Sequence, residues 1–132
     1  MSSTEKQLLG RLGEDAVTRR YAEMGFTVKD RNVHVSHNEI DLILQSDTHL
    51  LFVEVKTRHA TLGARSRFGR PADAVNKAKR ARIVEAAKAY LRDNPTRLQP
   101  RIDIAEVYVN RGTDGADRIT DILIFPNAFG AH

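Results

Sequence analysis

The 132-residue sequence contains no cysteine and no tryptophan, and aromatic residues make up only 6% of it. The absence of cysteine excludes disulfide bridges, thiolate zinc sites and a cysteine nucleophile. The apolar runs are too short to span a bilayer, and the first residues lack the apolar segment of a secretory signal. The few aromatic residues are not interleaved with basic ones, which disfavours a base-stacking platform for single strands. We therefore expect a cytoplasmic protein.

Length and composition predict one ordinary globular domain over residues 1–132. Hydrophobic residues make up 41% and charged residues 29%, a balance that excludes disordered and fibrous classes. The formal net charge is only +4, but nine basic residues lie between positions 56 and 82, against the single acid Asp73. Such a cluster is typical of a phosphate-binding surface, and a solvated face is the alternative interpretation.

Apolar periodicity predicts an α/β domain in the order helix, three strands, helix, two strands, with a mixed sheet. The helices are expected at residues 4–24 and 71–92, and the strands at 26–28, 39–45, 50–58, 101–109 and 119–125. The second helix is expected to bury Val75, Ala78, Ile83, Ala86 and Tyr90. Residues 59–70 are rich in glycine, serine, alanine and arginine and predict a mobile basic loop.

The predicted hairpin over residues 39–58 gathers charged side chains on one face. A four-residue polar loop would pair Gln45 with Leu50. Asp41 then lies opposite Glu54, and Lys56 shares their face because side chains alternate along a strand. The other face carries the apolar residues Ile40, Leu42, Leu44, Leu51, Val53 and Val55. A shift of one residue would disrupt both sets, so the apolar pattern itself supports this register.

Two opposed carboxylates are suited to binding a hard cation. Oxygen ligands without cysteine or paired histidines favour Mg²⁺ or Mn²⁺ over zinc. A lysine beside them, Lys56, fits phosphodiester chemistry: it would orient or deprotonate the attacking water, or neutralise charge at phosphorus. The alternative is a cross-strand salt-bridge group on a solvated face. The opposed Asp41, the flanking Glu39 and the basic cluster favour the site.

Four more charged residues have two interpretations each. Glu14 lies at the margin of the apolar face of the first helix, where it would lean towards the metal or stay on the surface. Lys79 and Arg82 fall within the apolar stripe of the second helix, so they would reach a phosphate or the acids, or extend their charged ends to water. Asp103 lies inside a strand, where a structural pairing with Arg101, Lys79 or Arg82 is favoured.

Several motifs resemble the YraN family of uncharacterised bacterial proteins. They are GRLGED at 10–15, NEIDLI at 38–43, FVEVKTR at 52–58, Ala74-Val75 with Lys79 and Arg82, and PNAF at 126–129. These motifs occur in the right order over nearly the whole chain. The family is similar in fold to PD-(D/E)XK nucleases and especially to archaeal Holliday junction resolvases. The resemblance therefore implies a single restriction-endonuclease-like domain.

The resemblance also implies roles for individual residues. Asp41 and Glu54 would be metal ligands with the Val55 carbonyl as a further ligand, Lys56 would be the catalytic lysine, and Glu14 would complete the acidic site. We expect backbone phosphates to bind the basic residues Arg58, Arg65, Arg67, Arg70, Lys79 and Arg82.

Together these features predict a Mg²⁺- or Mn²⁺-dependent endonuclease acting on DNA, branched DNA included. Because resolvase-like relatives cut as two-fold dimers, the resemblance also implies a homodimer. A non-catalytic nucleic-acid-binding or accessory protein that retains the fold is the main alternative. A protein-interaction module with an acidic partner is the third.

Overall fold

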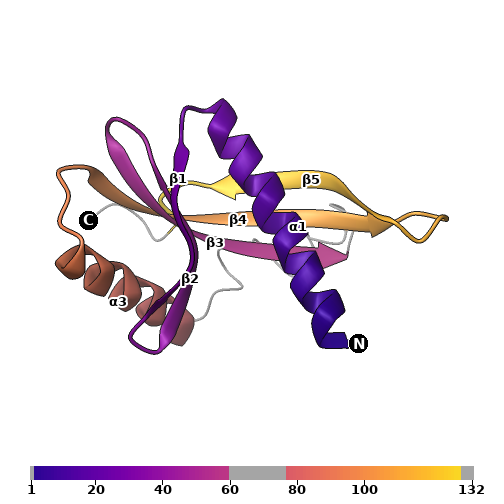
Figure 1. Cartoon of the computed structure of the whole chain (residues 1–132), viewed down its shortest axis with the longest axis horizontal. Helices are drawn as coiled ribbons and strands as arrows, with labels where there is room; N and C mark the ends of the chain where they lie inside the picture. Colours follow the sequence, from indigo (N-terminus) through magenta and orange to yellow (C-terminus); the bar gives the residue numbers. More distant parts are fainter. Residues whose placement is uncertain (1, 60–76, 129–132) are drawn as a thin grey trace.

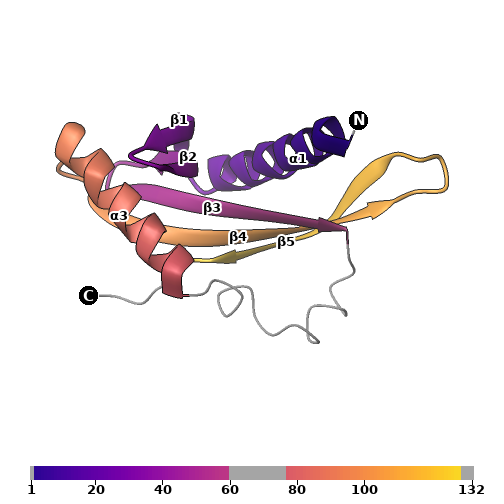
Figure 2. The same cartoon turned by 90° about the horizontal axis from the view of Figure 1, so that it is seen from below.

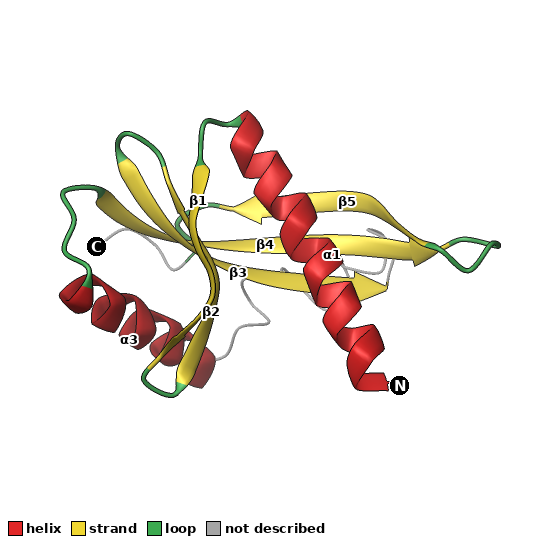
Figure 3. Cartoon of the chain, in the orientation of Figure 1, coloured by secondary structure: helices red, strands yellow, loops and turns green. Residues whose placement is uncertain are grey.

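The computed structural model describes residues 2–59 and 77–128, which form two helices and five strands (Figures 1 and 3). The helices are α1 (Ser2–Glu23) and α3 (Lys77–Asp93). The strands are β1 (Thr27–Val35), β2 (Asn38–Gln45), β3 (His49–His59), β4 (Gln99–Arg111) and β5 (Asp117–Phe125). The predicted α/β class, with a mixed sheet and flanking helices, is confirmed.

The five strands form one sheet in the order β1-β2-β3-β4-β5. Neighbouring strands run antiparallel except for β3 and β4, which are parallel. A parallel pair needs a crossover connection, and α3 lies in it. The two helices lie towards opposite ends of the long strands β3 and β4 (Figures 1 and 2).

Each helix covers its own apolar core on one face of the sheet. On the α1 face, Val17 and Tyr21 pack against buried residues of the strands, namely Leu42, Leu44, Leu51, Val53, Ala105, Val107 and Val109. On the α3 face, Ala86, Ala87 and Tyr90 pack against Ile40, Ile43, Leu50 and Phe52. Neither described helix is long and apolar enough to cross a membrane.

The predicted hairpin register is confirmed. Gln45 pairs with Leu50 and Leu42 pairs with Val53, and the predicted apolar residues from Leu42 to Val55 lie in or against the α1 core. The prediction was wrong for Ile40, which packs in the α3 core. The described pairing of β2 with β3 ends at Leu42, and beyond it β2 continues to pair with β1. Once β2 has separated from β3, it follows β1, and Ile40 packs with Val33 and Val35 of β1 in the α3 core.

Other boundaries differ from the predictions in the same direction: the strands are longer. The strand predicted at 26–28 extends to Val35, because β1 is an edge strand of mostly exposed polar residues and shows no apolar alternation. Asn32 adopts a positive φ of 50° within it. His59, predicted as the first residue of a loop, belongs to β3 and pairs with Val109 of β4. The remainder of that predicted loop, and residues 71–76 of the predicted second helix, lie outside the described residues.

The contact of α1 with the sheet depends on a glycine. A Cβ atom at Gly13 would overlap the hydroxyl group of Thr57 on β3. Glycine therefore allows the helix to approach the strand more closely than any other residue would. This close approach brings the next residue, Glu14, to the sheet while leaving it only 9% exposed.

Candidate active site

The centre of the candidate site is the point where β2 and β3 separate. Just beyond the last described pair, Leu42 with Val53, the side chain of Asp41 replaces a backbone group. Its Oδ2 accepts a hydrogen bond of 2.8 Å from the Val55 N–H. The N–H and C=O groups of a residue in an extended strand point to the same neighbouring strand. The Val55 carbonyl is therefore directed to the side on which Asp41 lies.

Glu54 lies close enough to Asp41 to raise the pKa of that carboxyl group. Burial and, next, the charge of Glu54 raise the pKa of Asp41 to about 7, while the Val55 hydrogen bond opposes the rise. The side chain of Glu54 is 14% exposed. Two mostly buried carboxylates that repel each other in this way would be stabilised by a shared cation. The predicted juxtaposition of these two acids is thus present in the structure.

Two lysines complete the group, one from β3 and one from α3. Lys79 Nζ lies 3.1 Å from Glu54 Oε1. Burial, together with the hydrogen bond and charge of Lys79, lowers the pKa of Lys56. Burial opposes charge on Lys79 as well, but its contacts with Lys56 and Glu54 outweigh that effect and raise its pKa. Lys56 is therefore the amine that gives up its proton more readily.

Glu14 lies within electrostatic reach of Asp41, but its hydrogen bonds are to β1. Its Oε1 accepts from the Arg31 guanidinium at 3.4 Å and from the Asn32 side-chain amide at 3.3 Å. Its charge is one of the lesser causes, after burial and Glu54, that raise the pKa of Asp41. The structure thus places Glu14 beside the site, with its carboxylate oriented by β1.

The predicted phosphate-binding residues are dispersed. Arg58 is paired with Glu106, at 3.7 Å between the guanidinium and Oε2, and its side chain is 37% exposed. Arg82 is exposed. Arg65, Arg67 and Arg70 lie outside the described residues. Among the predicted positions within the described chain, only Lys79 contacts the acidic pair.

The predicted burial of the second helix was wrong at its start. Ala78 is exposed rather than buried, and Arg82 is exposed rather than within an apolar stripe. The reason is that α3 contacts the sheet through its second half, where Ala86 and Tyr90 are buried as predicted. Val75 lies outside the described residues. The start of the helix therefore presents Lys79 at its margin with the sheet.

Sequence reasoning missed Glu106, a carboxylate only 1% exposed on β4. It pairs in register with Lys56, and it accepts a hydrogen bond from the Tyr108 hydroxyl as well as binding Arg58. The available signal was an acid in the middle of an otherwise apolar run, residues 104–109. This buried acid balances the positive charge of Arg58 beside the site.

Asp103 has the structural role that was favoured for it. It is 0% exposed and accepts two hydrogen bonds of 2.9 Å from Arg101, which was one of its three expected partners. The Tyr21 hydroxyl and the Asn127 N–H add bonds of 2.7 and 3.0 Å. This cluster ties α1 and the residues after β5 to β4, and it does not contact the acidic pair.

The donor set fits a magnesium ion that keeps part of its coordination shell. Within residues 2–59 and 77–128, no three acidic, histidine or cysteine side chains gather as a metal-binding group. Mg²⁺ in proteins commonly uses one or two carboxylates and completes its octahedron with water and substrate phosphates. Asp41, Glu54 and the Val55 carbonyl match that pattern, whereas an all-protein cage would need more ligands.

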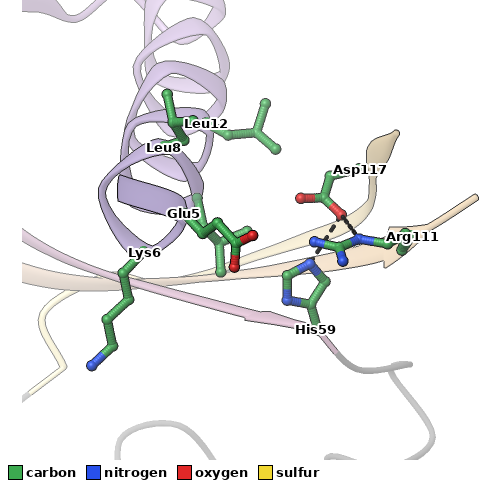
Figure 4. A pocket seen from close by; sticks show the side chains of 8 residues that line it. Glu5, Lys6, Leu8, Leu12, His59, Arg111 and Asp117 are labelled. Atoms are coloured by element: carbon green, nitrogen blue, oxygen red, sulfur yellow. Dashed lines mark hydrogen bonds and ion pairs between the residues drawn. The ribbon is translucent and has the colours of Figure 1, made fainter. Parts of the chain in front are cut away.

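A hollow of about 480 Å³ lies on the other face, between α1 and the ends of β3, β4 and β5. Leu8 and Leu12 form its apolar side (Figure 4). Opposite them Asp117 binds His59 Nε2 at 3.0 Å and Arg111 Nε at 3.3 Å. None of the predicted site residues within the described chain lines this hollow. It is therefore distinct from the candidate site.

Comparison with known proteins decides the family. Residues 13–107 match the sequence model of the Uncharacterised protein family UPF0102. The chain belongs to this family. UPF0102 is the YraN family, so the resemblance seen in the motifs is confirmed. The matched span includes Glu14, Asp41, Glu54 and Lys56.

UPF0102 proteins from distant bacteria match over nearly their whole length. The Syntrophomonas wolfei protein is 36% identical over 123 residues, 92% of this chain and 96% of the relative. The Syntrophotalea carbinolica protein is 37% identical over 122 residues, covering 92% and 90%. The Chloroherpeton thalassium protein is 32% identical over 123 residues, covering 91% and 92%.

Among solved structures, this UPF0102 chain is similar to Pyrococcus furiosus SfsA in complex with Ca²⁺. The TM-score is 0.42 at 13% identity, covering 89% of this chain and 64% of that chain. A similarity this distant carries no argument about activity.

Proposed function

We propose that this UPF0102 protein is a Mg²⁺-dependent endonuclease that hydrolyses phosphodiester bonds in DNA, with branched DNA as the first substrate class to test. One observation carries the proposal: the Asp41 carboxylate, fixed by the Val55 N–H at 2.8 Å, lies beside Glu54. Lys56, two residues beyond Glu54, points to the same face of β3. Opposed acids followed by a lysine supply both a cation site and a proton acceptor.

Each residue of the group has a separate task in this proposal. Asp41, Glu54 and the Val55 carbonyl hold the metal ion, which when bound supplies a Lewis acid for the phosphoryl oxygen. Lys56 receives a proton at Nζ from the attacking water. Burial and the neighbouring Lys79 lower the pKa of Lys56, which increases the fraction of neutral amine available as a base.

Basic side chains hold the substrate in this proposal. Arg58 lies two residues beyond Lys56 on the same face of β3, and Lys79 and Arg82 come from α3. Their contacts would be with backbone phosphates, which orient DNA without reading its sequence. We therefore expect affinity that falls steeply with salt concentration and depends little on sequence.

The proposal is tested by cleavage of four-way junction, flap, linear duplex and single-stranded DNA in Mg²⁺ or Mn²⁺. The informative variants are Asp41→Asn, Glu54→Gln and Lys56→Met, which change charge or proton-accepting ability with little change in size. Asp47→Asn is the matched control, because Asp47 is exposed in the turn of the same hairpin. We expect metal-dependent cuts that Lys56→Met slows by about 10²–10⁴-fold and that Asp47→Asn leaves unchanged.

The assay also separates the alternatives. Binding of DNA without cleavage, equal in wild type and all variants, would refute the catalytic assignment and support a non-catalytic nucleic-acid-binding protein. Absence of DNA binding even at low salt would favour the protein-interaction module. Sedimentation velocity on the same preparation tests the proposed homodimer.

A further inference from the structure

A lysine of the chain already contacts one of the two carboxylates assigned to the metal. Lys79 Nζ lies 3.1 Å from Glu54 Oε1, and the two side chains are only 30% and 14% exposed. Lysine carries a full positive charge at neutral pH. The ammonium group therefore neutralises Glu54 in the metal-free protein.

An ammonium group and a divalent cation cannot both contact Glu54 without repelling each other. Opposite or like charges at a few ångströms interact strongly where water is partly excluded. Glu54 is in such a place, since it lies between Asp41 and the start of α3 and is mostly buried. Binding of a dication at this carboxylate therefore opposes the present position of Lys79.

The attachment of Lys79 to the fold allows it to move. The helix α3 is anchored by Ala86, Ala87 and Tyr90 in its second half, whereas Ala78 beside Lys79 is exposed. A lysine side chain has four flexible carbon atoms and a rotatable ammonium group. The charged end can therefore leave Glu54 without unpacking the helix from the sheet.

We propose that Lys79 is an internal counterion of the site, which neutralises Glu54 until a divalent cation replaces it and then turns to a phosphate of the substrate. The inference rests on the proposed function only for the assignment of Glu54 as a metal ligand. In this arrangement, cation binding and phosphate binding are coupled, because the cation that completes the site also releases Lys79 to bind a phosphate.

The test is Mn²⁺ binding to the full-length, metal-free protein, measured by titration calorimetry at low salt. Lys79→Met removes both the competing ion pair and the repulsion of the dication, so we expect Mn²⁺ to bind about tenfold more tightly than in wild type. Lys79→Arg keeps the charge and is expected to bind as wild type does. Lys88→Met is the matched control, because it removes the same charge from an exposed position on the same helix.

A second measurement follows the released group. Fluorescence anisotropy with duplex DNA in Ca²⁺ or EDTA should show tighter DNA binding with the cation in wild type and in Lys88→Met. In Lys79→Met this gain should be smaller, because the residue that the cation releases is absent.

The outcomes separate this inference from the proposed nuclease activity. Equal or weaker Mn²⁺ binding by Lys79→Met overturns the inference and leaves the nuclease proposal intact. Tighter binding by Lys79→Met, in a protein that cuts no DNA, supports the inference and refutes the activity. Absence of Mn²⁺ binding in both proteins overturns both.

Discussion

The substitution Asp41→Asn is expected to stabilise the metal-free protein at neutral and alkaline pH. Burial and then the charge of Glu54 raise the pKa of Asp41 from 3.8 to about 7. Between about pH 4 and pH 7 the folded protein therefore keeps a proton that the unfolded chain has lost. The stability of the wild type falls as the pH rises through this window and is lowest above it. The asparagine side chain does not ionise in this pH range, so the Asp41→Asn variant does not lose this stability as the pH rises.

The size of the effect follows from the same pKa. One pKa unit corresponds to about 1.4 kcal/mol, so ionisation of Asp41 costs the fold at most about 4 kcal/mol above pH 7. Asp41 keeps partial access to solvent, so we expect about half of this limit, about 2 kcal/mol. The side-chain oxygen of the substituted asparagine can still accept the bond from the Val55 N–H, which preserves the local geometry.

Urea unfolding followed by circular dichroism, in EDTA at pH 4 and pH 8, measures this difference. Any change in the free energy of unfolding that asparagine causes independently of pH is the same at both pH values, so it cancels in the comparison. The control Asp47→Asn, in the exposed turn of the hairpin, should differ from wild type by less than about 0.5 kcal/mol at both pH values. The reasoning is refuted if Asp41→Asn gains no stability relative to wild type between pH 4 and pH 8.

Two further predictions concern the framework around the site. Gly13→Ala should lower the free energy of unfolding by about 1–3 kcal/mol, because the new methyl group overlaps the Thr57 hydroxyl. Adding Thr57→Ala to this variant should restore most of the lost stability. A double mutant whose stability is the sum of the two single effects would contradict the explanation. Asp103→Ala should cost about 3–5 kcal/mol, because it leaves Arg101 and Tyr21 without their buried acceptor. Thermal unfolding of Asp103→Ala beside Tyr21→Phe checks this, and equal midpoints in wild type and Asp103→Ala would count against it.

The hairpin that carries the site could be predicted because its sequence pattern permits one register. Leu42, Leu44, Leu51 and Val53 share the α1 core. Sliding either strand by one residue would turn the apolar residues of that strand away from this core. That constraint alone predicted that Asp41 lies beside Glu54. The prediction did not require knowing which helix covers either face of the hairpin.

The far side of the hairpin could not be predicted in the same way. The face of the hairpin that carries the charged residues also carries Ile43 and Phe52, and α3 packs over both. Alternation shows which residues share a face but not which helix covers it. The prediction for Ile40 was wrong for a related reason. The order of apolar and polar residues does not show that β2 separates from β3 beyond Leu42.

Contacts between distant segments were the hardest part of the site. The position of Lys79 in the sequence gave a helix but not its contact with Glu54, which depends on where α3 crosses the sheet. Arg31 and Asn32 lie beyond the strand predicted at 26–28, and both bind Glu14. The spacing of residues along the sequence does not show which distant residues such long polar side chains contact.

The Asp41 carboxylate accepts a hydrogen bond from the Val55 N–H. It therefore lies both at the end of the backbone pairing of β2 with β3 and within the candidate site. Wherever residue 41 lacks an acceptor, the Val55 amide loses this partner. Pairing of β2 and β3 one step further would then compete with the open arrangement, and it would engage the Val55 carbonyl in the sheet. Asp41 thus ends the pairing of β2 with β3 and leaves the Val55 carbonyl outside the ladder. Under the proposed metal assignment, loss of Asp41 would therefore remove two ligands, its own carboxylate and that carbonyl.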